Sequence, residues 1–206
     1  MTFYVFTVII GWSAVVLSGV VAFSQFRRIN HRGIEGVSLA TWTLFTYMAL
    51  FWILYGISIH SWQLVVGSVV ALPFQLMIWQ RLKPWDRPRV GLHSLAFFAA
   101  FCCAPAIFWG WSGAAVGAGT AGWVTRTPQL VQLVRHEGAS GVSTSSWLTA
   151  GFASGLWVIY YSGAHLWPVM SVTAVAGLVS LSIAALAGWR HHQVEVTLGF
   201  GHAVAD

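Results

Sequence analysis

The feature that most constrains the fold is a tandem repeat. Shifting residues 138–167 back by 105 positions in the 206-residue chain aligns nine identical residues, four of them aromatic. The matched pairs are Gly33/Gly138, Gly36/Gly141, Val37/Val142, Ser38/Ser143, Trp42/Trp147, Trp52/Trp157, Tyr55/Tyr160, His60/His165 and Trp62/Trp167. Upstream, an offset of 104 pairs Gln25 with Gln129 and Ser24 with Pro128. Matches of this kind indicate two copies of one structural unit.

The composition indicates that this repeat lies in a membrane. The chain is 57% hydrophobic and only 7% charged, with a mean hydropathy of +0.73, whereas soluble domains carry about 25% charged residues. Long apolar segments without alternating polarity predict membrane-spanning helices and not strands. We predict seven of them, at about 3–23, 38–58, 62–82, 91–109, 112–134, 144–162 and 166–189. The predicted fold class is an all-α integral membrane protein.

The basic residues predict its orientation. All ten Lys and Arg residues lie in or beside the loops that follow the first, third, fifth and seventh segments. The opposite connections, near His60, Gly110 and Gly163, contain none. The positive-inside rule therefore puts the N-terminus outside and the C-terminus in the cytoplasm. Because the charge of +5 is scattered between apolar segments, we expect membrane lipid as a partner and not nucleic acid.

The repeat and the orientation together predict the domain organisation. A three-helix unit ends on the side opposite its start, so a second copy keeps the same orientation only if one extra helix separates the two. We predict a first unit at 1–83, a linker helix at 84–111 and a second unit at 112–190, followed by a weakly ordered cytoplasmic tail at 191–206. The two units would be parallel repeats about an axis along the membrane normal. Small residues spaced by four, such as Gly113 and Gly117, favour close helix packing in lipid.

Several motifs of the repeat resemble those of the PQ-loop superfamily. They are the Pro128–Gln129 pair, the Gly141-Val142-Ser143 run and the two Trp-x-x-Tyr motifs, Trp52–Tyr55 and Trp157–Tyr160. Two three-helix units joined by one helix resemble its SWEET branch of sugar transporters, whose half-sized bacterial relatives are the SemiSWEETs. The resemblance covers about 3–189. It implies that each unit packs its helices in the order 1-3-2, and that solute passes between the units by alternating access.

The resemblance also implies positions for hinges and gates. The proline near the cytoplasmic end of each unit's first helix would be a hinge, which is Pro128 in the second unit but Ser24 in the first. Any hinge should therefore differ between the halves, unless Pro128 is only a static kink. Gln25 and Gln129 would line the cytoplasmic gate, and the repeat-matched Tyr55 and Tyr160 would form the outer gate.

The resemblance places solute-binding residues on the second and third helices of each unit. Trp52 and Trp157 would lie against a sugar ring, since an indole face suits its apolar C–H face. The alternative is that they belong to an interfacial aromatic belt, for which the outer Trp62 and Trp167 are better candidates. The family's third-helix asparagine corresponds to two hydroxyl residues, Ser68 and Thr173, which line a pocket or bond to backbone carbonyls.

Charge inside the membrane is confined to one residue. Arg126 falls within a predicted segment, where it either snorkels to the cytoplasmic interface or faces the solute path. The five acidic residues fall in cytoplasmic loops or the tail, at Glu35, Asp86, Glu137, Glu195 and Asp206. Proton-driven transporters usually keep a titratable residue within the membrane, so the lack of an embedded carboxylate favours passive transport.

The sequence contains no pattern typical of an enzyme. It has no candidate catalytic residues, no metal-ligand spacing and no phosphate-binding glycine loop, so we expect no cofactor and no metal. We predict a passive uniporter of a small neutral solute, a mono- or disaccharide, in the cell membrane of a bacterium. The alternatives are a carrier of a small organic acid or amino acid, and a receptor or sorting protein that binds without translocating. One chain holds both units, so a monomer suffices, while association into a homo-oligomer stays open.

Overall fold

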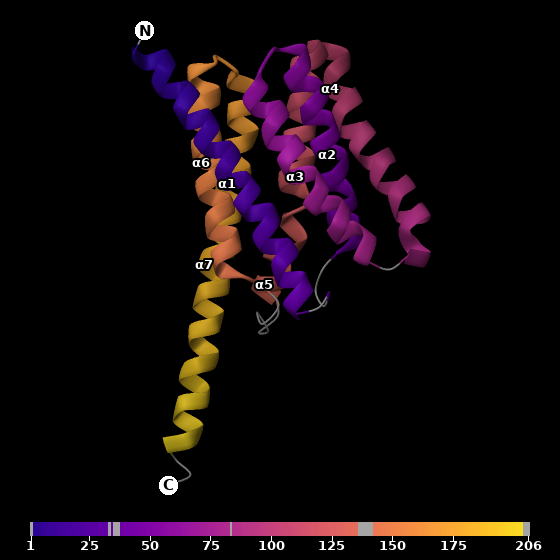
Figure 1. Cartoon of the computed structure of the whole chain (residues 1–206). Helices are drawn as coiled ribbons and strands as arrows, with labels where there is room; N and C mark the ends of the chain where they lie inside the picture. The colour runs from indigo at the N-terminus through magenta and orange to yellow at the C-terminus, as the bar shows by residue number, and fades with distance from the viewer. Residues whose placement is uncertain (1, 33, 35–37, 83, 136–141, 204–206) are drawn as a thin grey trace.

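The structure is a computed structural model, and it describes residues 2–32, 34, 38–82, 84–135 and 142–203. The described chain is helical, with no strand among these residues. Its helices are α1 (Thr2–Arg32), α2 (Leu39–Ser58), α3 (Trp62–Arg81), the short 3-10 helix η1 (Pro84–Asp86), α4 (Arg87–Val124), α5 (Thr127–Arg135), α6 (Thr144–Gly163) and α7 (Trp167–Ala203). Figure 1 shows them as one bundle with the two termini at opposite ends.

Five helices are long and apolar enough to cross a membrane, namely α1, α2, α3, α4 and α7. The prediction of a helical, multi-pass membrane protein is therefore confirmed. The predicted segment 144–162 forms α6, which is not among the five. Nine of its 20 residues are Ser, Thr or Gly, and these lower its hydropathy although its length suffices.

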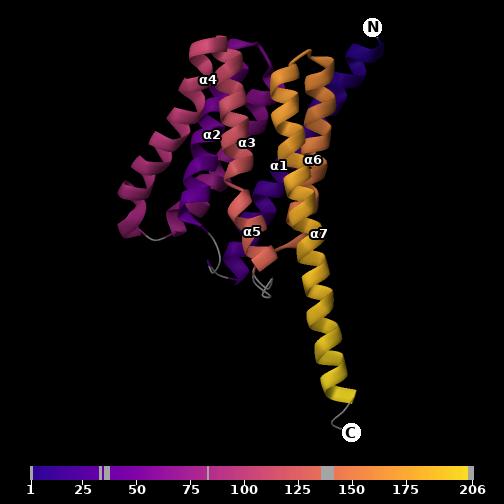
Figure 2. The ribbon, with the colours of Figure 1, turned by 180° about the vertical axis from the view of Figure 1, so that it is seen from behind.

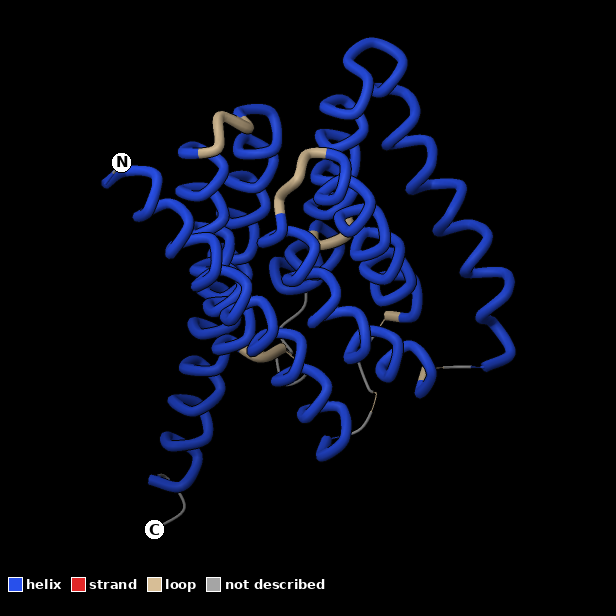
Figure 3. The backbone as a smooth tube through the Cα atoms, turned by 45° about the horizontal axis from the view of Figure 1, so that its top comes forward, coloured by secondary structure: helices blue, strands red, loops and turns tan. Residues whose placement is uncertain are grey.

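The helix α4 contains a sharp reversal. The backbone leaves helical geometry at Trp109 (φ −130°, ψ 15°) and at Gly110 (φ 54°, ψ −137°), a left-handed conformation that glycine adopts without strain. The two arms on either side of this break pack closely against each other. A Cβ at Gly113 would collide with the backbone of Pro105, and a Cβ at Gly117 would collide with that of Phe101. Figure 3 shows this helical hairpin. Its break falls between the predicted segments 91–109 and 112–134.

The predicted segment 112–134 is itself interrupted. It is divided between α4 and α5, with a turn at Thr125 and Arg126. The reason is Pro128, which lacks the N–H that would bond to Val124 in a continuous helix and is tolerated only in the first turn of a new one. The side chains of Pro128 and Gln129 lie outside the described residues.

The helices α2 and α6 begin and end at repeat-matched residues. Ser38 and Ser143 are their N-caps, and each side-chain oxygen accepts a hydrogen bond from the backbone N–H three residues on. Each C-terminus is a Schellman turn that passes through a histidine with positive φ, 55° at His60 and 57° at His165. All of these residues are 105 positions apart, so the repeat is visible in the backbone as well as in the sequence.

The helices form two groups. α3 contacts both α1 and α2, while α7 contacts α4, α5 and α6, and the groups meet where α1 contacts α6 and α2 contacts α4. We call the end with the α2–α3 turn, Gly110 and the α6–α7 turn the turn end. The basic end is the opposite one, where α1, α3 and α5 finish (Figures 1 and 2).

The C-terminal segment differs from its prediction. The seventh predicted segment ends at 189, but α7 continues to Ala203 and extends beyond the bundle (Figure 2). No proline follows Pro168 in the chain, so nothing in the sequence forces the helix to stop at the predicted membrane boundary.

Candidate solute-binding cavity

A large cavity lies between the two helix groups. Its volume is about 1010 Å³, and residues of α1, α2, α3, α4, α6 and α7 line it. Four of its lining residues are the predicted solute-binding residues, Trp52, Ser68, Trp157 and Thr173. The two pairs are repeat-matched, so each helix group contributes an indole and a hydroxyl to the same space.

Aromatic neighbours hold the two indoles in place. Trp52 makes edge contacts with Phe51 and Tyr55, at centroid distances of 5.3 and 5.7 Å. Trp157 stacks on Tyr161 at 5.5 Å, and its indole N–H donates to Ser18 Oγ of α1 at 3.1 Å. Both indoles are half-buried. In contrast, Trp62 and Trp167 are 65% and 52% exposed, and neither lines the cavity.

The two hydroxyl residues differ in what they can offer a solute. Thr173 Oγ1 donates to the Val169 carbonyl at 2.7 Å, so its proton is held by the helix and only its lone pairs face other groups. Ser68 makes no hydrogen bond within the described part of the chain, and its hydroxyl can both donate and accept.

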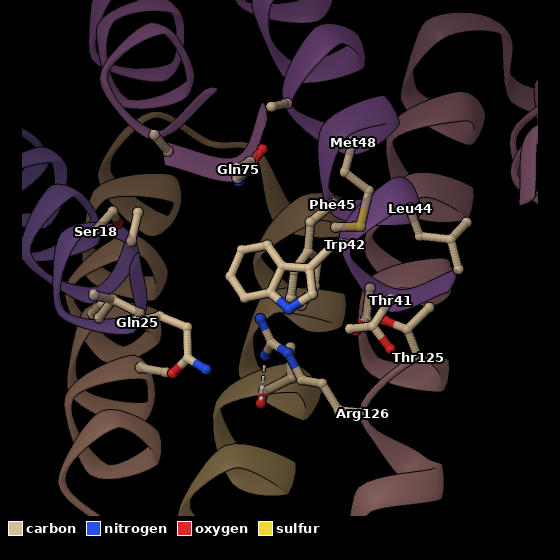
Figure 4. A pocket seen from close by; sticks show the side chains of 18 of the residues that line it. Ser18, Gln25, Thr41, Trp42, Leu44, Phe45, Met48, Gln75, Thr125 and Arg126 are labelled. Carbon is tan, nitrogen blue, oxygen red and sulfur yellow. Dashed lines mark hydrogen bonds between the residues drawn. The ribbon is translucent and has the colours of Figure 1, made fainter. Parts of the chain in front are cut away.

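A polar region lies closer to the basic end. Arg126 lines the cavity, and its Nη1 donates to the Ala176 carbonyl at 3.0 Å and to Ser180 Oγ at 3.1 Å, both on α7. The guanidinium thus lies within the bundle. Figure 4 shows it beside Trp42, with Gln25 pointing toward the same space from α1. Gln75 also lines the cavity, and its buried Oε1 has no hydrogen-bond partner among the described residues.

An aromatic cluster closes the cavity at the turn end. Tyr55, Tyr160 and Tyr161 are buried there together with Leu64, Ala115 and Val169. The predicted gate residues Tyr55 and Tyr160 lie in this cluster and not in the cavity lining, although Trp52 and Trp157 pack against them.

Hydrogen bonds across the two helix groups reinforce the cluster. Tyr160 Oη lies 2.7 Å from Ser61 Oγ and donates to Gln63 Oε1 at 3.2 Å. α1 also approaches α6 closely here, since a Cβ on Gly11 would lie 2.6 Å from Tyr160 Cδ2. The turn end is therefore sealed by contacts between the two groups.

At the basic end the cavity reaches solvent. Its lining extends to Ser38 and Ala40, which are exposed at the start of α2, and to Ser143 at the start of α6. Gln25 lines this part of the cavity. Ser24 does not, and its hydroxyl donates to the Val21 carbonyl at 2.9 Å.

Sequence reasoning missed many of the residues that line the cavity, among them Trp42, Trp147 and Gln75. Trp42 and Trp147 are one of the nine repeat pairs, so their identity was a usable signal, yet neither was assigned to the site. Gln75 is an amide within an apolar helix, which is a costly position unless it faces a cavity or a partner.

The described residues provide no evident metal centre. No group of three His, Cys, Asp or Glu side chains among them could hold a metal ion. The charged or titratable residues in the described lining are Arg28, His93, Arg126 and Tyr161, with no Asp or Glu. Comparisons with protein-family models, with curated proteins and with solved structures match nothing.

Proposed function

We propose that the chain is a passive transporter (a uniporter) that moves a small hydroxylated solute across a cell membrane by alternating access. The observation that carries this proposal is the cavity between the two helix groups, with repeat-matched indoles and hydroxyls in its wall. Its closure at the turn end and its opening at the basic end are what one state of an alternating-access carrier requires. The resemblance to SWEET transporters makes a neutral mono- or disaccharide the first solute to test.

The membrane topology of the proposal has seven crossings. They are α1, α2, α3, the two arms of the α4 hairpin, α6 and α7, with α5 completing the second arm. The first arm, residues 87–108, then joins two three-helix units, and its Gly91 carbonyl accepts a hydrogen bond from Tyr47 of α2 at 3.2 Å. The basic residues put the basic end in the cytoplasm. The cavity is then open to the cytoplasm and closed to the outside.

The closed end is held weakly enough to open during transport. A net hydrogen bond contributes about 0.5–1.5 kcal/mol, and two of them join Tyr160 to Ser61 in the α2–α3 turn and to Gln63 at the start of α3. Minor conformations a few kcal/mol above the ground state are commonly populated in proteins. The turn at Thr125 and Arg126, next to Pro128, interrupts the helix on the cytoplasmic side and supplies a bend only in the second unit.

The test is uptake of radiolabelled sugars into proteoliposomes. We expect saturable uptake down the gradient, lowered about tenfold by Trp52→Ala or Trp157→Ala, which corresponds to about 1.4 kcal/mol of lost solute contact. Trp62→Ala and Trp167→Ala are the matched controls, because they remove another repeat-matched tryptophan pair that lies outside the cavity. Equal losses in both pairs would refute the assignment of the cavity indoles to the solute.

If the protein binds a solute but takes up none of those tested, a receptor with this fold is favoured over a transporter. A second candidate solute, an organic acid, is favoured by one observation, the position of Arg126 in the cavity wall.

A further inference from the structure

We infer that the cavity binds its solute as a carboxylate, with Arg126 as the carboxylate-binding residue and Gln75 as an acceptor for a solute hydroxyl. The solute class is thus a small hydroxycarboxylate, such as a sugar acid. This inference rests on the proposed function, because it takes the cavity as the solute path, and it narrows the chemistry of that solute.

The first observation is the unused donor capacity of Arg126. A guanidinium has five N–H donors in a planar fork that matches the two oxygens of a carboxylate. Only Nη1 makes hydrogen bonds to described residues, at Ala176 and Ser180. Toward the described part of the chain, Nε and Nη2 keep three donors unused, and the side chain lines the cavity.

The second observation is the charge of the cavity. Its described lining contains the guanidinium of Arg126 but no Asp or Glu. A cation within a helix bundle is costly unless an anion or several acceptors compensate it. Two contacts on α7 compensate Arg126 in part, and an anionic solute would complete the compensation.

The third observation is the orphaned acceptor on α3. Gln75 Oε1 is buried without a partner among the described residues, and Gln75 lines the cavity. A carboxylate alone cannot satisfy this oxygen, because it needs a donor. A solute hydroxyl supplies one, which is why the class is a hydroxycarboxylate and not a simple fatty or aromatic acid.

The spacing along α7 fits a molecule of this size. Arg126 bonds to Ala176, which lies about one turn, or about 5 Å, from Thr173 at the helical rise of 1.5 Å per residue. A sugar-sized solute with its carboxylate on Arg126 therefore reaches the level of Thr173. The first unit has no matching cation, because the offset of 104 aligns Arg126 with Ala22. An anionic solute would therefore bind in a single orientation, with its carboxylate at Arg126.

The experiment compares D-glucuronate with D-glucose, which share a ring and differ by a carboxylate in place of a hydroxymethyl group. Binding to the purified full-length protein is measured through tryptophan fluorescence or thermal stabilisation. We expect glucuronate to bind at least about tenfold more tightly than glucose, and Arg126→Gln to weaken glucuronate binding about a hundredfold and glucose binding far less.

The matched control is Arg190→Gln. Arg190 also donates to a backbone carbonyl of the neighbouring helix, from Nη2 to Val134 at 3.4 Å, but it does not line the cavity. Its removal should leave the preference for glucuronate intact. Equal losses in the two variants, or no preference in the unaltered protein, would overturn the inference and leave Arg126 as a tie between helices.

A second measurement needs no variant. Uniport of an anion moves charge, so a membrane potential that is positive inside the vesicle should accelerate glucuronate uptake and leave glucose uptake unchanged. Uptake of glucose without binding or uptake of glucuronate would overturn this inference while the proposed transport stands. Arg126-dependent binding of glucuronate without flux would sustain the anion site while the proposed transport fails.

Discussion

Removing the hydroxyl group of Tyr160 should make the closed end of the cavity open more often. Tyr160→Phe keeps the ring that packs against Trp157 and Tyr161 but deletes the hydroxyl that bridges the helix groups. Two hydrogen bonds are lost, to Ser61 at 2.7 Å and to Gln63 at 3.2 Å. At about 1 kcal/mol each, the closed state loses about 2 kcal/mol, which is about a 30-fold shift toward opening.

The assay is chemical labelling from outside. Ser68 is replaced by cysteine in a background without Cys102 and Cys103, because Ser68 lines the cavity below the seal. A membrane-impermeant maleimide is then added to the outside of oriented vesicles. With Tyr160 present, labelling should be slow, and with Tyr160→Phe its rate should rise by about the same 30-fold, since the reagent reports the open population.

The control is Tyr161→Phe. Tyr161 is buried in the same cluster, but its hydroxyl makes no hydrogen bond within the described residues, so its removal should leave the labelling rate unchanged. Labelling that is unaffected by Tyr160→Phe, or raised equally by Tyr161→Phe, would show that this bridge is not what closes the turn end.

Two further predictions concern stability, and thermal unfolding in detergent measures both. His60→Gly and His165→Gly should each stabilise the protein by about 1 kcal/mol, because both histidines have a left-handed φ that only glycine adopts freely, and a lower melting temperature in both would contradict this. Gly117→Leu should destabilise it by about 3 kcal/mol or more, since any side chain there meets the backbone of Phe101. Gly155→Leu is the control, because a Cβ at Gly155 has nothing within 4 Å, and similar losses in both variants would exclude the close approach as the cause.

The sequence predicted the ends of α2, α3 and α6 to within about one residue, for a local reason. Ser38 and Ser143 are good N-cap residues, and each is followed by a segment of membrane-spanning length. The paired identities then required the two copies to begin and end alike, as α2 and α6 do. The break at Gly110 was also predictable, because two apolar segments of membrane length meet there without room for a loop.

Features that depend on partners across the bundle were harder to predict. Nothing local to Arg126 distinguishes snorkelling from a position against Ala176, because that choice depends on where α7 lies. The split between α4 and α5 was missed for a different reason. Pro128 was interpreted as a bend within one helix, whereas the chain makes a turn before it and starts a new helix at Thr127.

The duplication explains why the cavity is symmetric in one respect and asymmetric in another. Indoles and hydroxyls recur in both units, at Trp52 and Trp157 and at Ser68 and Thr173, so the wall near the seal is built twice from one pattern. The polar region near Arg126 does not repeat in the two units. Arg126 aligns with Ala22 of the first unit. Ser180, which accepts a hydrogen bond from Arg126, aligns with Gln75. A path that opens alternately to the two sides benefits from equal halves, because both must move against each other. Recognition of a solute with two unlike ends requires unequal halves, and the departures from the repeat are located where such recognition would occur.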